Sequence, residues 1–313
     1  MAAKTCSDQE FIELFRSSGA AATARKLGVG VRSVQARRRR IEDRTRQDIT
    51  APVFAPAVEH KAQVNIRVPD GVVLVGSDAH YWPGKETVMM RAFRTFLGTM
   101  QPKVVILNGD VFDGAAISRW PSVGFLERKP EVHEELEACR EWLDTLVEAS
   151  GDARLFWTLG NHDLRFETFF AAHALQMKGV KGVHLKDHFP AWTPAWSLMI
   201  NQDVWVKHDC KGGKHATYLN SQASGKSTVT GHLHSANVRP ITDLNGTRYG
   251  VDTGMMGDPY DEQFIHYTRA NVVDWRSAFV VLTFRNGRLM QPELVLKWSD
   301  DAVEFRGEVV RVT

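Results

Sequence analysis

Apolar side chains in the first fifty residues lie three or four positions apart, which is the spacing of one face of an α-helix. Residues 7–10 are Ser-Asp-Gln-Glu, the pattern of a capping box that begins a helix. Two more short helices are predicted over residues 20–27 and 32–41, separated by Gly28 and Gly30. The pattern therefore predicts a small all-helical unit at this end of the chain.

A different pattern begins near residue 72, after a stretch that contains two prolines and has no periodicity. Short apolar runs typical of buried strands alternate there with amphipathic helical stretches. The strands are expected at residues 72–75, 104–107, 155–159, 204–206, 228–230, 249–251, 279–284 and 294–296, and the helices at 87–100 and 131–149. This order predicts right-handed crossovers and an α/β sheet covered by helices. The predicted organisation is a helical domain over 1–47, a linker over 48–66 and an α/β domain over 67–313.

Five of the predicted strands end in side chains of the types that bind metal ions. Because ligand-binding loops follow the carboxyl ends of strands in an open α/β sheet, we expect these side chains to converge. Carboxylates, imidazoles and one amide, without cysteine, suit divalent ions such as Mn, Fe, Zn or Co and differ from a structural zinc site. The motifs are Asp78-Ala79-His80, Gly109-Asp110-Val111-Phe112-Asp113, Gly160-Asn161-His162-Asp163, His208-Asp209 and Gly231-His232-Leu233-His234.

These motifs, taken in this order, resemble those of the calcineurin-like metallophosphoesterase superfamily. The resemblance implies a four-layer α/β/β/α sandwich with two divalent metal ions at its edge, Mn being the first candidate and Fe, Zn, Co or Ni the others. It further implies that Asp110 bridges the two ions. By the same match, the first ion is held by Asp78, His80 and His234, and the second by Asn161, His208 and His232.

The resemblance also implies a reaction. Two ions clamp a phosphoryl group and lower the pKa of a shared water, so that the bridging hydroxide attacks phosphorus. In the family the histidine of the third motif, here His162, does not bind metal but assists the leaving oxygen. Asp113 is expected to orient the ring of His162 and to favour its imidazolium form.

Two positions depart from the family's pattern. His208 is followed by Asp209 where the family often has glycine, so other histidines compete for its role: His215, His184 and His188. Gly114 stands where the serine/threonine phosphatases of this superfamily carry a phosphate-binding arginine. This second departure argues against a protein phosphatase of that branch.

Candidate substrate contacts follow two of the metal motifs. Arg119 and Trp120 lie in the loop after the predicted bridging aspartate, and Arg165 follows His162 by three positions. Each of these side chains has the chemistry to reach a phosphate or to stack on a base. Packing at the surface is the alternative for each of them.

Charge is distributed unevenly along the chain. The net charge is only +2, but residues 1–50 contain 11 Lys and Arg against 6 Asp and Glu. A basic segment attached to a mildly acidic body favours an anionic partner for the segment alone. A solvated helix end is the alternative interpretation of the arginine run at residues 37–40.

The basic segment also has the spacing of a helix-turn-helix. Ala24, Gly28 and Val34 would supply a small residue at the helix crossing, a permissive turn and an apolar contact. On the second, recognition-like helix, the predicted nucleic-acid contacts are Arg32, Gln35, Arg37 and Arg38. A plain interaction or oligomerisation bundle is the alternative.

The leading hypothesis is a two-metal phosphodiesterase that acts on DNA or RNA. It combines the metal motifs with the basic helical unit, and Gly-Asp-Val-Phe-Asp at residues 109–113 is similar to the nuclease branch of the superfamily. One alternative is a phosphatase or a phosphodiesterase for nucleotides or cyclic nucleotides. Another is a DNA-binding regulator whose phosphoesterase fold is catalytically idle.

Composition limits the classes of protein and the cellular compartments that we expect. Hydrophobic residues make up 43% and charged residues 24% of the 313 residues, values that exclude a mostly disordered chain. The absence of a long apolar run, of an apolar leader and of paired cysteines leads us to expect a cytoplasmic protein with no membrane partner. The combination of domains is similar to that of phage-encoded proteins, for which this would be the host cytoplasm.

Overall fold

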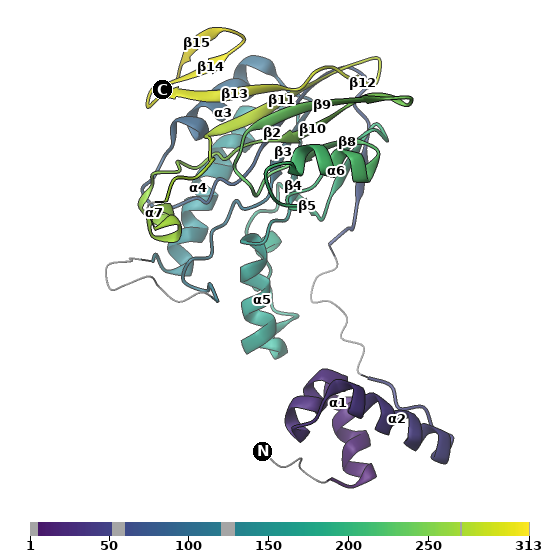
Figure 1. The fold of residues 1–313 in the computed structure, drawn as a ribbon. Coiled ribbons are helices and arrows are strands. Elements are labelled where there is room, and N and C mark those ends of the chain that lie inside the picture. Colours follow the sequence, from purple (N-terminus) through teal and green to yellow (C-terminus); the bar gives the residue numbers. More distant parts are fainter. Residues whose placement is uncertain (1–5, 52–59, 120–128, 270, 313) are drawn as a thin grey trace. The chain divides into compact units, whose positions relative to one another are not determined.

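The computed structural model describes residues 6–51, 60–119, 129–269 and 271–312 (Figure 1). The chain divides into two compact units, Met1–Ala57 and Val58–Thr313. Among the helices in the described ranges, none is both long enough and apolar enough to cross a bilayer.

The smaller unit is helical, as the sequence predicts. α1 (Asp8–Leu27) begins with the Ser7 capping box and is interrupted at Gly19, whose φ of 72° is not helical, so that it consists of two helical segments. It ends at Gly28, whose φ of 70° is left-handed. Glycine adopts this conformation without strain because it has no side chain. α2 (Val31–Thr45) follows after this short turn. The core between these helices contains Phe11, Phe15, Ala24, Leu27, Val34, Ile41 and Ile49.

Two arginines of α2 lie against this core. The guanidinium of Arg37 is 4.7 Å from the centre of the Phe11 ring and donates to Asp8 Oδ1 at 2.8 Å. The guanidinium of Arg38 lies 5.6 Å from the Phe15 ring, and its Nε is 3.5 Å from Glu42. Both side chains are therefore engaged within the unit.

The larger unit contains two β-sheets (Figure 1). One has nine strands in the order β15-β14-β13-β11-β2-β3-β4-β5, with β12 also paired to β11. Strands β2 to β5 are parallel, whereas β11, β13, β14 and β15 are antiparallel. The bounds are β2 (Gly71–Gly76), β3 (Val104–Asn108), β4 (Arg154–Thr158), β5 (Thr193–Ala195), β11 (Ala278–Arg285), β12 (Arg288–Leu289), β13 (Glu293–Ser299), β14 (Ala302–Phe305) and β15 (Glu308–Arg311).

The second sheet has six strands in the order β1-β6-β7-β8-β10-β9. Its first strand, β1 (Val64–Ile66), pairs in parallel with β6 (Leu198–Ile200), so the end of the segment expected as linker, 48–66, forms part of a sheet. Asn65 lies between Val64 and Ile66, so the sequence shows no apolar run there. The remaining strands are β7 (Val204–Val206), β8 (Ser227–Thr230), β9 (Asn237–Asp243) and β10 (Gly246–Asp252).

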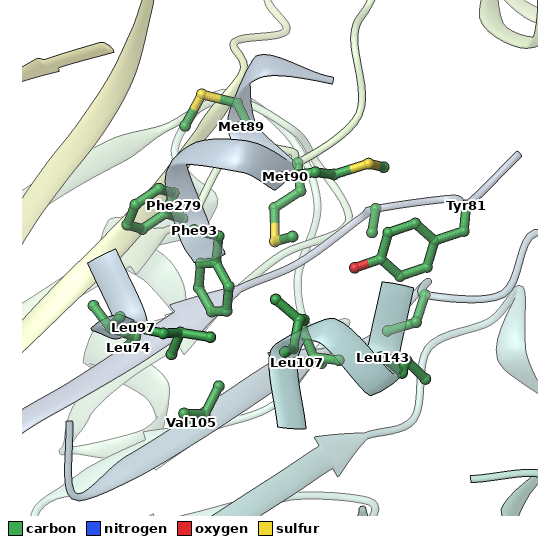
Figure 2. Packing of buried hydrophobic residues seen from close by; sticks show 14 of the residues in the cluster. Leu74, Tyr81, Met89, Met90, Phe93, Leu97, Val105, Leu107, Leu143 and Phe279 are labelled. Carbon is green, nitrogen blue, oxygen red and sulfur yellow. The ribbon is translucent and has the colours of Figure 1, made fainter. Parts of the chain in front are cut away.

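Alternation along β2 shows how the layers pack. Val73 and Val75 point into the core between the two sheets, together with residues of β6, β7 and β8. Leu74 points the other way, into the core beneath α3 (Val88–Met100) and α4 (Val132–Ser150) (Figure 2). A strand buried on both faces reads as a continuous apolar run, which is the pattern of residues 72–75.

A further helix covers the outer face of the six-stranded sheet. α6 (Ala216–Ser224) packs on β8, β9 and β10, and a Cβ added at Gly250 would lie 2.0 Å from the carbonyl oxygen of Thr217. The layers are therefore helix, sheet, sheet and helix, which confirms the predicted α/β sandwich. The other helices are α5 (Asp163–His173), η1 (Leu175–Met177), η2 (Leu185–Asp187) and α7 (Glu262–Thr268).

The small unit should be sensitive to a single core truncation. Phe11 is fully buried, and Phe→Ala changes in cores cost about 3–5 kcal/mol, close to the whole stability of a unit of this size. We expect Phe11→Ala to remove hydrogen-exchange protection from α1 and α2 while leaving the protection of β2, β3 and β11 unchanged. Phe169→Ala, at a phenylalanine that is 39% exposed, is the matched control. Retained protection of α1 in the Phe11 variant would contradict this packing.

Candidate metal centre

The predicted metal ligands and catalytic residues lie in five loops at the ends of strands. Asp78 and His80 follow β2, and Asp110 and Asp113 follow β3. His162 lies between β4 and α5, His208 follows β7, and two histidines follow β8. β2, β3 and β4 are parallel, as are β7 and β8, so within each sheet these loops emerge at one edge. Contacts between side chains of the two sheets then join the two edges.

The first group consists of Asp78, His80 and His234, whose ligand atoms all lie within 4.8 Å of one another. His234 Nε2 is 3.0 Å from Asp78 Oδ1, so this contact links the nine-stranded sheet to the six-stranded one. All three residues are buried. They are the residues that the family resemblance assigns to one ion.

The second group consists of Asp110, His208 and His232, again with ligand atoms within 4.8 Å of one another. His208 is fully buried, and its Nε2 lies 3.2 Å from Asp110 Oδ2 and 4.0 Å from Asp78 Oδ1. Its ring therefore lies between the carboxylate of the first group and that of the second. The two groups share one site.

The backbone at this site is unusual. Asp78, His80, Asp110, His232 and His234 all have positive φ, between 44° and 70°, although none of them is glycine. A left-handed conformation costs a residue with a side chain about 1–3 kcal/mol, and it persists only where the surroundings enforce it. Because five of the predicted ligands have this conformation, we infer that the surrounding structure holds the loops in a strained backbone that directs these side chains into the site.

Two glycines allow the loops to approach one another closely. A Cβ at Gly160 would lie 2.1 Å from Asp110 Oδ1, and a Cβ at Gly231 would lie 2.5 Å from Asp78 Oδ2. Any larger residue would displace a carboxylate of the site. Each glycine thus stands where a backbone lies directly against a predicted metal ligand.

The histidines fit the role of metal ligands. His80 Nδ1 donates to Asp113 Oδ1 at 2.7 Å, and His208 Nδ1 donates to the carbonyl oxygen of Asn108 at 2.7 Å. The Nε2 atoms of both rings are buried and have no well-formed hydrogen bond within the described residues. Metal-binding histidines are held in this way, with one nitrogen fixed by a carboxylate or carbonyl and the other directed at the ion. Together with the two carboxylates, this donor set fits divalent cations.

The charges of the site also attract cations. Burial raises the pKa of Asp78, but the nearby His234 and His208 lower it to about 2, and His208 and His162 likewise keep the pKa of Asp110 well below its usual value. Burial lowers the pKa of His208, yet the carboxylates of Asp110 and Asp78 raise it to about 10. These two ionised carboxylates therefore bind a positive charge strongly at the position between them. Metal binding needs the neutral ring and would displace that proton.

His162 lies beside both groups, and its ring is fixed. Its Nδ1 is 2.9 Å from Asp113 Oδ1, its backbone N–H donates to Asp110 Oδ1 at 2.8 Å, and its Nε2 is 3.0 Å from a guanidinium nitrogen of Arg165. Burial lowers the pKa of His162, but Asp110 and Asp113 outweigh this effect and raise it. Arg165 also donates to the carbonyl oxygen of Asp113 at 2.9 Å. The structure therefore brings His162, Asp113 and Arg165 together.

Asp163 is a residue whose importance the sequence did not reveal. Its buried carboxylate accepts hydrogen bonds from the backbone N–H groups of Asp110, Val111, Phe112 and Gly160, and from the indole of Trp157, at 2.8–3.1 Å. It therefore holds the loop after β3 against the loop after β4. Its place as the last residue of the Gly-Asn-His-Asp motif was the available signal.

Two more buried carboxylates support neighbouring loops. Asp252 accepts the N–H groups of Ser235, Ala236 and Gly254, behind the loop that carries His234. Glu135 of α4 accepts the N–H of Ala115 at 3.0 Å; burial, then the charge of Asp113, raises its pKa to about 8. A lone glutamate on the apolar face of α4 was the signal for the second.

The other predicted residues are placed as follows. Asn161 is exposed, but its neighbours Gly160 and His162 both lie against Asp110. Arg119 is exposed, and Trp120 lies outside the described residues. Two of the three alternatives to His208 form hydrogen bonds to nearby carbonyl oxygens: His184 to that of Lys178 and His188 to that of Gly182. The third, His215, is exposed at the start of α6.

Comparison with known proteins agrees with the site. Residues 71–264 match the sequence model of the family described as calcineurin-like phosphoesterase. This match spans more than half of the chain, which therefore belongs to the calcineurin-like phosphoesterase family. The predicted resemblance is confirmed, and the protein is accordingly a hydrolase of phosphoesters. The family and the donor set together indicate divalent metal ions as cofactors.

Two similar proteins come from phages. The gene 54 protein of Mycobacterium phage D29 is 26% identical over 238 residues, which cover 71% of this chain and 92% of the relative. The gene 54 protein of Mycobacterium phage L5 is 25% identical over 247 residues, with the same two coverages of 71% and 92%. Among solved structures, zinc-bound Vps29 from Entamoeba histolytica is 14% identical, covers 77% of this chain and 98% of its own, and has a TM-score of 0.39. That likeness is too weak to bear on activity.

Replacing Asp163 should loosen the site without touching a predicted ligand. An asparagine side chain at this position would offer one acceptor oxygen and turn an NH₂ group toward N–H donors, and each buried donor left unpaired costs about 1–3 kcal/mol. For Asp163→Asn we expect unfolding in urea at lower concentration, with at least about 2 kcal/mol lost, and Mn affinity by calorimetry reduced about 10- to 100-fold. Asp144→Asn, at an exposed position of α4, is the control. Unchanged Mn affinity in the Asp163 variant would show that the loops do not depend on this carboxylate.

Proposed function

We propose that the larger unit hydrolyses phosphodiester bonds with two divalent metal ions, and that nucleic acid is its substrate. The observation that carries the proposal is the position of His162. It lies beside the two ligand groups, with Asp110 Oδ2 4.0 Å from its Nε2, but its ring nitrogens are directed at Asp113 and Arg165. Asp113 also fixes His80, a predicted ligand, but the Nε2 of His162 is 3.0 Å from the guanidinium of Arg165, whereas the Nε2 of His80 has no hydrogen bond among the described residues. A histidine next to a metal centre whose second nitrogen contacts another side chain has the arrangement of a group that handles a proton.

The ligand groups assign the metal ions to residues. Asp78, His80 and His234 would hold one ion, and His208, His232 and Asn161 the other, with Asp110 between them. When bound, two such ions supply Lewis-acid stabilisation of the phosphoryl oxygens and activate the attacking water. Mn is the first ion to test, followed by Fe, Zn, Co and Ni.

His162 would donate a proton to the leaving oxygen. Its Nδ1–H donates to Asp113, which leaves Nε2 as the atom that faces the reaction. The guanidinium of Arg165 has only N–H donors, so its contact with Nε2 requires a neutral ring. Protonation of Nε2 therefore requires that Arg165 release it. A phosphate oxygen is the acceptor that would take over this guanidinium when substrate binds.

The cationic side chains around the site favour a diester. Position 114, where the serine/threonine phosphatases have a phosphate-binding arginine, is a glycine here. A Cβ at Gly114 would lie 3.2 Å from the side chain of Arg165. The guanidinium of Arg165 donates to the carbonyl oxygen of Asp113 at 2.9 Å and lies 3.0 Å from His162 Nε2. One guanidinium suits the single negative charge of a diester better than the double charge of a monoester. Nucleic acid is favoured over a small diester because the same chain carries a basic helical unit.

The division of roles can be tested with two substitutions. His162→Asn should keep both metal ions in elemental analysis by mass spectrometry but lose about 10²- to 10⁴-fold in kcat, the usual contribution of general acid–base catalysis. Asp110→Asn should lose both metal and activity. The loss in His162→Asn should be larger for a dinucleotide, whose alkoxide needs a proton, than for bis-p-nitrophenyl phosphate, whose leaving group does not. His215→Asn is the matched control, and an equal loss for both substrates would contradict proton donation.

The substrate class can be tested with the whole chain and added Mn, with and without a chelator. We expect cleavage of bis-p-nitrophenyl phosphate and of single- or double-stranded DNA, abolished by the chelator, and weak activity on p-nitrophenyl phosphate. Monoester activity alone would favour the phosphatase alternative. Inactivity with all five metals would instead favour a regulator with an idle site.

Arg165 should act mainly on substrate binding. A hydrogen bond from a charged donor contributes about 1.5–3 kcal/mol, so we expect Arg165→Met to lower kcat/KM for a diester about 10- to 100-fold through a higher KM. Arg165→Lys should recover part of the loss because it restores the charge. Steady-state kinetics that show a lower kcat at unchanged KM would mean that Arg165 acts only by orienting His162.

A further inference from the structure

The outward face of α2 carries a row of arginines that are not packed against the core of the small unit. Arg32, Arg39 and Arg40 are exposed, and Ser33 and Ala36 between them are small and exposed as well. Positions three, four, seven and eight apart lie on one side of a helix, so these residues form a single face. We define this set of five residues as the outer face of α2.

The inner face of α2 is fixed by packing. Val34 and Ile41 are buried in the helical core, and Arg37 and Arg38 lie over the rings of α1. The orientation of the outer face is therefore set by the fold of the unit. Of the four arginines in the run 37–40, only the last two face outward.

The start of α2 adds to the positive potential. Its first turn contains no acidic residue, and Gly30, which precedes it, provides no side-chain cap. The first acidic residue of α2 is Glu42, which pairs with Arg38 and accepts the N–H of Ile49. Most helices place acids near the amino end, where backbone N–H groups make the potential positive. Their absence over residues 31–41 leaves this end suited to an anion.

The turn before α2 has the length and the left-handed glycine that a helix-turn-helix requires. Gly28 ends the second segment of α1 with left-handed φ, and the N–H of Val29 donates to the carbonyl oxygen of Ala24 at 3.1 Å. Only three residues separate the two helical segments, and the side chains of Ala24 and Val34 are both buried where they meet. This arrangement presents the second helix, with its amino end forward, to a groove.

We propose that the outer face of α2 binds the major groove of duplex DNA. The core of a protein–protein interface is depleted of charge and enriched in aromatic side chains, whereas the outer face of α2 is charged, and among the described residues of the small unit only Val31 is an exposed large apolar side chain. An RNA duplex would not admit the helix, because its major groove is deep and narrow. In this assignment Arg39 and Arg40 contact phosphates, and Arg32, near the amino end, reaches base edges.

This inference goes beyond the proposed hydrolytic function, since it concerns a separate unit and requires no chemistry. Binding can be measured without metal, so that cleavage does not interfere. The probe is a fluorescently labelled 30-base-pair DNA duplex of mixed sequence, and the protein is the whole chain in EDTA. A failure of binding and a failure of hydrolysis are then distinguishable.

The decisive variant replaces Arg32, Arg39 and Arg40 by alanine together. We expect fluorescence anisotropy to show at least a tenfold loss of affinity, and the slope of log affinity against log salt to fall by about 2, because about one counterion is released for each of the two phosphate contacts. Hydrolysis of bis-p-nitrophenyl phosphate should be unchanged. Replacing the same three residues by lysine should keep most of the salt slope, which shows that the unit still folds and that charge is what matters.

The control variant removes three exposed arginines of the larger unit: Arg140→Ala, Arg285→Ala and Arg288→Ala. It has the same net charge as the outer-face variant and should bind DNA like the parent protein. Equal losses in the two variants would overturn the proposal, because only net charge would then be at work. Tighter binding to an RNA duplex or a single strand of the same sequence, or no binding to the duplex at 50 mM salt, would overturn it as well.

Discussion

Two loops that lie 53 positions apart in the chain meet at the carboxylate of Asp163. Because five N–H groups from β4 and from the loops after β3 and β4 donate to its two oxygens, neither loop can move without leaving buried donors unpaired. Asp110 is one of the residues held in this way, and its own carboxylate then accepts the N–H of His162. A buried acid that is not among the predicted ligands thus positions both a predicted ligand and the predicted proton donor.

The same constraint explains why so many predicted ligands have left-handed backbone. A residue such as Asp110 or His234 gains nothing locally from a positive φ, so its conformation must be stabilised by what lies around it. Asp163 stabilises the first of these loops, and Asp252 stabilises the loop that carries His234. Gly160 completes the arrangement, because it lets one loop lie directly on the carboxylate that the other one carries. The backbone strain at the ligands is therefore maintained by the hydrogen bonds that Asp163 and Asp252 accept from the loops.

The sequence predicted the buried strands that form apolar runs and the site residues that directly follow these strands. The runs at residues 72–75 and 104–107 are buried on both faces, and the motifs after them meet at one site. It did not predict β1, β5, β6, β9, β12, β14 or β15. β1, β5 and β6 are three residues long, and whether so short a segment pairs in a sheet depends more on its partner than on its own pattern. β7 is equally short but was predicted from its apolar run Val-Trp-Val. β5 even contains Pro194, which a strand tolerates at the edge of a sheet but which a sequence pattern treats as a break. The roles of Asp163 and Asp252 were missed for a related reason, since their partners are backbone groups that leave no trace in the sequence.

The run of four arginines in α2 shows that a count of charges in the sequence does not tell which of the side chains face outward. Successive residues of a helix are rotated by about 100°, so four consecutive arginines cannot face the same way. Val34 and Ile41, seven residues apart, define the inner face, and Arg37 and Arg38 lie between them on it. A guanidinium can occupy such a position because it packs flat on an aromatic ring while it keeps its hydrogen bonds, as Arg37 does over Phe11. Counting charges therefore overestimates what a basic helix offers to a partner, and the core beneath it decides which of its cations are free to bind.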